Sequence, residues 1–363
     1  MHALYEIQRC MREYSWQSMD VRESISNQTD VGLSLTKHVA LTEAKDSNLF
    51  LPPSSTRELL SLITAGSKGP TLDQLLSFLK SKSDDQLNTF AAELVAVVFA
   101  DGSPSGGSRL SAANGVRIDQ SLSLGNTFKQ IVDNIYKAAS NQVDFQTKAA
   151  EVYREVNMWA EKETNGLIKE VLPPGSVDIS TKLIFANELK KRQFVSALMV
   201  SKFYGFLPNK VRISAISPCT FSLLDGKDGL PILVEKMGSE SRFLDRHLPS
   251  QKVEVGEFMI PKFKVSCGIE VSNALEGLGL ELPFFGEGVV WQRWWIPLGK
   301  CLIEVNEGGT KPVATSVVRV ALMCMPLYDK IYFVANHPFV FIIREDMIGL
   351  VMFIGHVLNP LAG

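Results

Sequence analysis

Long apolar runs are missing from this sequence, although 45% of its 363 residues are apolar. A membrane-spanning helix needs about 18 or more consecutive apolar residues, so the sequence predicts no membrane partner. Residues 1–18 include Arg9, Arg12 and Glu13 and lack an uninterrupted apolar core, so they do not resemble a secretory signal. An excess of positive charge is missing as well, since 37 Lys and Arg stand against 39 Asp and Glu and the net charge is −2. This balance argues against nucleic acid as a partner.

Cysteine is scarce, and its positions form no metal-binding pattern. The chain has five cysteines, an odd number, at Cys10, Cys219, Cys267, Cys301 and Cys324. Without CxxC pairs or closely spaced histidines we expect free thiols, no metal and no cofactor. Free thiols fit a reducing compartment. With no signal peptide seen, the location that we expect is cytoplasmic or extracellular.

Motifs of the common enzyme classes are absent too. The sequence contains no GxSxG nucleophile elbow, no HExxH zinc motif and no phosphate-binding P-loop. Asp225–Gly229 has the composition of a calcium loop but lacks the terminal Glu, so a turn is the better interpretation. We therefore expect that this chain is not an enzyme.

The most informative region of the sequence lies near the C-terminus. Ile303–Thr310 has the pattern of a strand that leads into a loop, and small and β-branched residues continue to Val320. Phe333–Phe341 then returns to a largely apolar strand. The pattern predicts a solvated loop between two anchored strands. Its β-branched residues are also able to pair as a new strand in a sheet.

The returning strand carries a recognisable signature. Ala335, Asn336, His337, Pro338 and Phe339, followed by alternating apolar positions, resemble the C-terminal signature of the serpins. The loop before them resembles the serpin reactive loop. Two further serpin landmarks match at 156–168 and 278–280. The resemblance looks strongest to plant serpins and runs from residue 19 to the C-terminus.

This resemblance implies an α+β serpin fold, in which helices pack on three β-sheets and the reactive loop is exposed. It implies a single domain over residues 19–363, acting as a monomer, with a non-family N-terminal extension over residues 1–18. The apolar periodicity agrees with this fold. It predicts helices at Val21–Thr42, Ser55–Thr64 and Glu151–Thr164 and a strand at Arg109–Asp119.

Two interruptions separate this chain from the family pattern. After Asn187, charged residues replace the apolar half of a central strand, and we expect that half and the two strands after it to be deleted. A second gap follows Leu280. Pro52 and Gly299 replace members of the hydroxyl and imidazole cluster beneath the serpin sheet, while Ser55 and Asn187 remain. Parts of two sheets are therefore predicted to be missing.

The resemblance implies that the chain is a serine-type endopeptidase inhibitor that acts as a suicide substrate by loop insertion. Its partner is then a serine or cysteine protease. Counting about seventeen residues from Glu307 places the scissile bond at Met323–Cys324, whereas counting back from Phe333 favours Leu322–Met323. Either bond presents an apolar residue that suits a chymotrypsin-like pocket.

The hinge at the start of the loop differs from the family pattern. It consists of Glu307, Gly308, Gly309, Thr310, Lys311 and Pro312. Gly308 replaces an acidic residue and Pro312 replaces an Ala. Pro312 has no N–H to donate to a strand ladder, and an unsatisfied buried acceptor costs about 1–3 kcal/mol. Both changes oppose insertion, so the alternative is a non-inhibitory serpin-fold protein that is a protease substrate or a binding protein.

Overall fold

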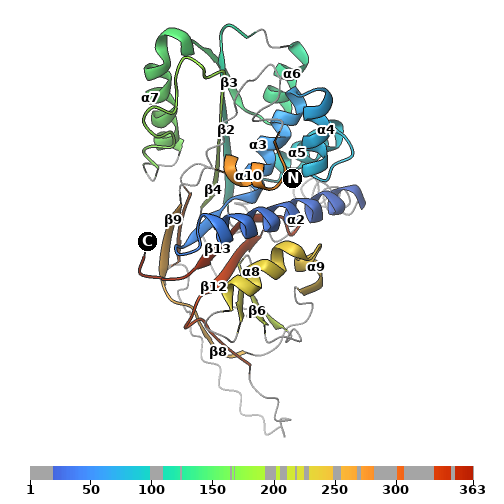
Figure 1. The fold of residues 1–363 in the computed structure, drawn as a ribbon, viewed down its shortest axis with the longest axis vertical. Coiled ribbons are helices and arrows are strands. Elements are labelled where there is room, and N and C mark those ends of the chain that lie inside the picture. The colour runs from blue at the N-terminus through green and yellow to red at the C-terminus, as the bar shows by residue number, and fades with distance from the viewer. Residues whose placement is uncertain are drawn as a thin grey trace, which may run out of the picture.

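The computed structural model describes most of the chain, and Figure 1 shows how its elements are arranged. The described residues are 19–98, 109–122, 125–163, 166, 168–192, 202–204, 211–216, 219–224, 229–247, 255–267, 271–281, 301–305, 331–344 and 348–362. The predicted extension over residues 1–18 and the predicted reactive loop lie outside them.

Helices dominate the N-terminal half, as the apolar periodicity predicts. The first described helix, α2, covers Met19–Thr42 and crosses the middle of the molecule in Figure 1. The others are α3 Pro53–Gly66, α4 Gly69–Phe78, α5 Asp84–Val98, α6 Asn126–Gln130, the π-helix η2 Ile131–Ile135, α7 Phe145–Glu163, α8 Leu230–Ser239, α9 Phe243–His247 and α10 Ser272–Gly277.

The largest sheet is antiparallel throughout and has the strand order β1-β13-β12-β7-β6-β5. Its strands are β1 Leu49–Leu51, β5 Lys202–Tyr204, β6 Val211–Ile216, β7 Cys219–Leu224, β12 Phe339–Arg344 and β13 Val351–Val357. The strands β12 and β13 form its buried centre, which explains why their sequences are almost continuously apolar rather than alternating.

The remaining described strands form three smaller ladders. In the first, β2 Arg109–Asp119 lies between β3 Ala139–Val143 and β4 Leu183–Arg192. In the second, β9 Phe263–Cys267 pairs antiparallel with β10 Cys301–Val305. In the third, β8 Val255–Met259 pairs parallel with β11 Ile331–Val334.

The main core lies between the six-stranded sheet and the helices α2 and α8, which Figure 1 shows over the same region of β12 and β13. Leu33 and Val39 of α2, Leu233 of α8, and Val340 and Ile354 of the sheet are all buried in it. Each fully buried side chain of this kind contributes about 1.5–3 kcal/mol relative to an exposed one. The core therefore fixes β12, the strand that follows the serpin-like signature.

The strand β4 runs further than the sequence predicted. The break in the apolar pattern suggested that the strand ends at Asn187, but β4 continues to Arg192, which lies opposite Arg109 of β2. Ladder hydrogen bonds join backbone groups, so charged residues continue a strand when a partner strand is present. The prediction of an end at Asn187 is wrong. The predicted loss of other strands concerns stretches outside the described residues and stays a prediction.

Candidate functional site

The predicted reactive loop falls on residues 306–330, which lie outside the described part of the chain. This applies to the whole hinge, Glu307 to Pro312, and to the scissile-bond candidates Leu322, Met323 and Cys324. The described geometry of the candidate site is therefore that of the strands on either side of these residues.

The strand β10 leads directly into the predicted hinge, because its last residue is Val305. Its ladder with β9 places Val305 opposite Phe263 and Glu304 opposite Lys264. Among the described strands, β10 is an outer strand of its ladder, as β4 is of the three-stranded ladder. An outer strand has backbone N–H and C=O groups that a further strand can pair with.

The strand β11 receives the chain on the other side of the predicted loop. It pairs parallel with β8, and the N–H of Ala335 then donates a hydrogen bond of 2.8 Å to the Met259 carbonyl. In the next residues the Nδ1 of His337 and the Oδ1 of Asn336 are 2.7 Å apart. The first bond joins the signature residues to β8, and the second links two neighbouring side chains within the signature.

Phe263 links the two sides of the predicted loop. Its ring lies 5.8 Å from that of Phe339 in an edge-on arrangement and 5.3 Å from that of Phe341. All three rings are buried. Since Phe263 is also the ladder partner of Val305, one aromatic cluster connects the strand before residue 306 with the strand after the signature. The local sequence around Phe263 gives no indication of this contact, because its ring partners lie far away in the chain.

The helix α7 lies beside β2 and β3 (Figure 1) and packs on the three-stranded ladder. Its buried residues Val152 and Val156 form a cluster with Leu172 and with the half-buried Ile184 of β4. Asn157, buried on the same helix, accepts hydrogen bonds from the N–H groups of Val171 at 2.8 Å and Leu172 at 2.9 Å. The amide side chain of this serpin-like motif thus holds the segment that leads to β4.

The cluster expected beneath the sheet is only partly described. Pro52 is buried and precedes α3, and no side chain there caps the helix. Ser55 is half-buried, and Asn187 lies opposite Asn114 of β2. Asn114 is buried and donates hydrogen bonds of 2.8 Å to the Glu58 carboxylate and to the Tyr136 carbonyl. Gly299 lies outside the described residues.

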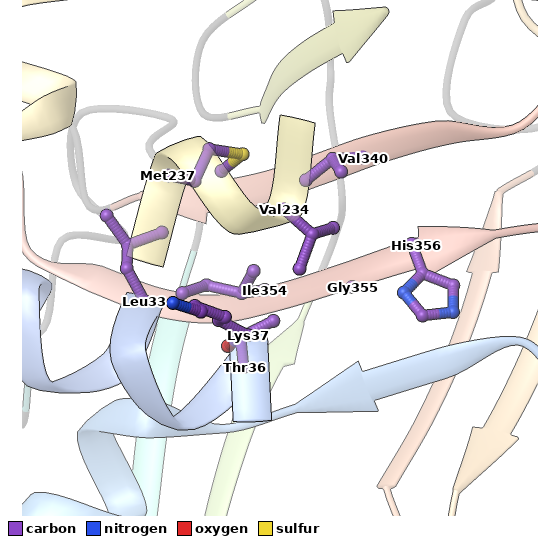
Figure 2. Close-up of a pocket in the computed structure, with 9 residues that line it drawn as sticks. All are labelled: Leu33, Thr36, Lys37, Val234, Met237, Val340, Ile354, Gly355 and His356. Carbon is purple, nitrogen blue, oxygen red and sulfur yellow. The ribbon is translucent and has the colours of Figure 1, made fainter. Parts of the chain in front are cut away.

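A small cavity lies between α2, α8 and the strands β12 and β13, as Figure 2 shows. It measures about 10 Å³, roughly the volume that one water molecule needs. The lining residues are Leu33, Thr36, Lys37, Val234, Met237, Val340, Ile354, Gly355 and His356. A cavity of this size is a packing gap and is far too small for a cofactor.

His356 borders this cavity and is buried. Burial lowers the pKa of its imidazole below the ordinary value, and the carbonyls of Ser47 and Ala44 offset only part of that effect. Its Nε2 lies 2.9 Å from the Ser47 carbonyl oxygen. The ring therefore joins β13 to the segment before β1 in its neutral form.

The described residues contain no group of three or more His, Cys, Asp and Glu side chains placed to hold a metal ion. Over the same residues, no helix has the length and apolar character needed to cross a membrane.

Comparison with known proteins gives a consistent result. A family model described as "Serpin (serine protease inhibitor)" matches residues 26–190 and 219–360. Serpin-ZX of Arabidopsis thaliana is 46% identical over 390 residues, covering 94% of this chain and all of the relative. Serpin-ZXA of Oryza sativa subsp. japonica is 39% identical over 404 residues, covering 94% of this chain and 98% of the relative.

Solved structures agree with the sequence relatives. The structure of Arabidopsis AtSerpin1 in its native stressed conformation has a TM-score of 0.78 and 42% identity, covering 95% of this chain and all of that one. Uncleaved ovalbumin has a TM-score of 0.75 at 17% identity, covering 92% of this chain and 99% of that one. The second likeness shows the fold alone. Together with the family model, these relatives show that this chain belongs to the serpin family and has the α+β serpin fold, with plant serpins among its similar proteins.

Proposed function

We propose that this chain engages serine or cysteine proteases as a suicide substrate, with residues 306–330 as its reactive loop. The observation that carries the proposal is the position of two strands. Among the described residues, β10 leads directly to residue 306, and both β10 and β4 are outer strands of their ladders. A cleaved loop that folds back beside β10 would meet an edge that no other described strand occupies, and its backbone could pair there as a new strand.

The protease carries out the chemical reaction, and this chain supplies the peptide bond that is cleaved. The protease hydroxyl or thiol attacks the carbonyl carbon of Leu322 or Met323, the C–N bond breaks, and the new amine leaves with the proton. The N-terminal part of the loop then remains joined to the protease as an ester or thioester. If the loop pairs as a strand before water attacks this bond, the protease stays attached.

A second candidate function is a serpin that proteases cleave without being trapped. Two residues favour it, because Pro312 removes a ladder donor and Gly308 removes the acidic residue of the family hinge. A cost of about 1–3 kcal/mol in the insertion step slows it roughly ten- to a hundredfold. Hydrolysis of the acyl-enzyme would then release a cleaved chain and a free protease.

One experiment separates the two functions. The full chain is incubated with a chymotrypsin-like, a trypsin-like and a papain-like protease, and the products are analysed on a denaturing gel and by thermal melting. A covalent adduct, together with a raised melting temperature of the cleaved chain, supports the suicide substrate. Cleavage without adduct and with an unchanged melting temperature supports the second candidate. As a control, a protease that lacks its nucleophile must give no adduct.

A further inference from the structure

Two of the five cysteines come together in the fold. Cys267 is the last residue of β9 and Cys301 is the first residue of β10, and the ladder register places them directly opposite each other. In the sequence they are separated by residues 268–300. Their spacing therefore gave no indication of a pair, and the sequence predicted five free thiols.

The backbone geometry of this position suits a disulfide. Opposite residues in an antiparallel ladder have Cα atoms about 4.5 or 5.5 Å apart, depending on the type of pair. Both values fall within the range of about 4.4–6.8 Å that disulfides require. Opposite residues also share one face of the ladder, since side chains alternate with a period of two along each strand.

The spacing of a ladder also affects how easily such a bond is reduced. Cβ atoms of opposite residues are typically about 4.5–5.5 Å apart, whereas relaxed disulfides hold them about 3.5–4.5 Å apart. Where the Cβ atoms lie toward the upper end of the ladder range, closing the bond strains the ladder. Strained disulfides have higher reduction potentials and respond to the surrounding thiol pool.

We infer that Cys267 and Cys301 form a reversible, redox-sensitive disulfide that joins β9 to β10. The oxidant is a low-molecular-weight disulfide such as oxidised glutathione. One cysteine thiolate attacks a glutathione sulfur and expels a glutathione thiolate, and the second cysteine thiolate then displaces the other glutathione. The two protein thiols lose two protons and two electrons, and oxidised glutathione becomes two reduced molecules.

The bond would fix the strand that precedes the proposed reactive loop. It would close residues 268–300 into a covalent loop, and this loop contains the position after Leu280 where the chain departs from the family pattern. Cross-linking lowers the entropy of the unfolded chain, so the oxidised form should melt a few degrees higher than the reduced form. The inference does not depend on whether the chain traps a protease.

The test is peptide mapping of the full, folded chain. Reduced protein is equilibrated in glutathione buffers ranging from mostly reduced to mostly oxidised, free thiols are blocked with N-ethylmaleimide, and trypsin products are analysed by mass spectrometry. Cleavage after Lys264, Arg293, Lys300 and Arg319 gives the peptides 265–293 and 301–319. We expect these two peptides to be joined by a reducible bond. The denatured chain should then show three free thiols instead of five.

Single Cys→Ser variants provide the matched comparison. Cys267→Ser and Cys301→Ser should each abolish the joined peptides and the difference in melting temperature between oxidised and reduced protein. Cys219→Ser should retain both, because the ladder partners of Cys219 are Ile216 and Ile343. Five free thiols in folded, oxidised wild-type protein would overturn the inference. So would a mapped bond from Cys267 or Cys301 to any other cysteine.

Discussion

At the residue scale, we expect Pro312 to have the largest effect on how the proposed loop behaves after cleavage. If the loop inserts as a strand, the side chains of Thr310, Pro312 and Ala314 share one face of it. Pro312 then has no backbone N–H to donate to the neighbouring strand. Gly308 adds backbone freedom where the family has an acidic residue. Neither residue prevents recognition by a protease, because both precede the scissile-bond candidates by ten or more positions.

Replacing these two residues should shift the outcome toward adduct. Because β4 continues to Arg192 along β2, the outer edge of that ladder is longer than the sequence predicted. We expect Pro312→Ala with Gly308→Glu to raise the ratio of adduct to cleaved chain roughly ten- to a hundredfold, the factor that corresponds to a ladder cost of about 1–3 kcal/mol. Gel densitometry after reaction with a chymotrypsin-like protease measures the ratio.

The matched control for this change is Val313→Ala. In an inserted strand, Val313 would lie on the face opposite to Pro312, and the substitution keeps the backbone N–H of residue 313. The ratio should therefore stay as in the parent chain. An unchanged ratio in the double variant would mean that the hinge is not the limiting defect.

His356 should make the stability of the fold depend on pH. Because burial lowers the pKa of His356, the unfolded chain binds more protons than the folded chain below pH of about 6.5, the ordinary histidine value. The stabilisation is therefore fully present above that pH and is lost as the pH falls through the lowered pKa. Urea unfolding at pH 7.5 and pH 5.5 should show a larger loss of unfolding free energy in the parent chain than in His356→Gln.

Thr36→Val is the control for this prediction, since Thr36 lines the same cavity and does not titrate. It should shift stability at both pH values equally. Equal pH dependence in the parent chain and in His356→Gln would show that other groups account for the effect.

At the scale of elements, the sequence predicted which segments form helices or strands better than it predicted the residues at which they begin and end. The strand at Arg109–Asp119 is confirmed, and the helix predicted at Val21–Thr42 begins two residues earlier. The helix predicted from Glu151 begins at Phe145, because the Asp144 carboxylate accepts a hydrogen bond of 2.9 Å from the Thr147 N–H and caps it. The kink at Lys148 interrupts the periodicity before that point, so the apolar pattern alone placed the start too late.

The attachment of α7 to the following segment gives a prediction at this scale. Asn157→Ala would leave the N–H groups of Val171 and Leu172 without their acceptor. An unsatisfied buried donor costs about 1–3 kcal/mol, so we expect a loss of about 2–4 kcal/mol in the free energy of unfolding, measured by urea denaturation. The neighbouring Met158 is 69% exposed, and Met158→Ala should change stability by less than about 0.5 kcal/mol. Similar effects of the two variants would contradict this role of Asn157.

At the scale of the whole molecule, local patterns could not supply contacts between distant segments. The loop flanks were predictable because strand patterns and the signature near residue 335 are local features. The ring cluster of Phe263, Phe339 and Phe341 and the opposition of Cys267 and Cys301 arise only when β9, β10 and β12 come together. The ladder that extends β4 to Arg192 depends in the same way on β2, its partner, which lies far away in the sequence.

The most direct test of the proposed reactive loop is to determine where a protease first cuts the folded chain. A chymotrypsin-like protease is added at low ratio, and intact-mass and peptide analysis identify the earliest fragments. We expect a first cut between Gly309 and Leu327, after Leu322 or Met323, because a substrate-like loop is the backbone most easily bound in a protease cleft. A first cut within the described helices or strands, or a chain that resists cleavage between residues 309 and 327, would contradict it.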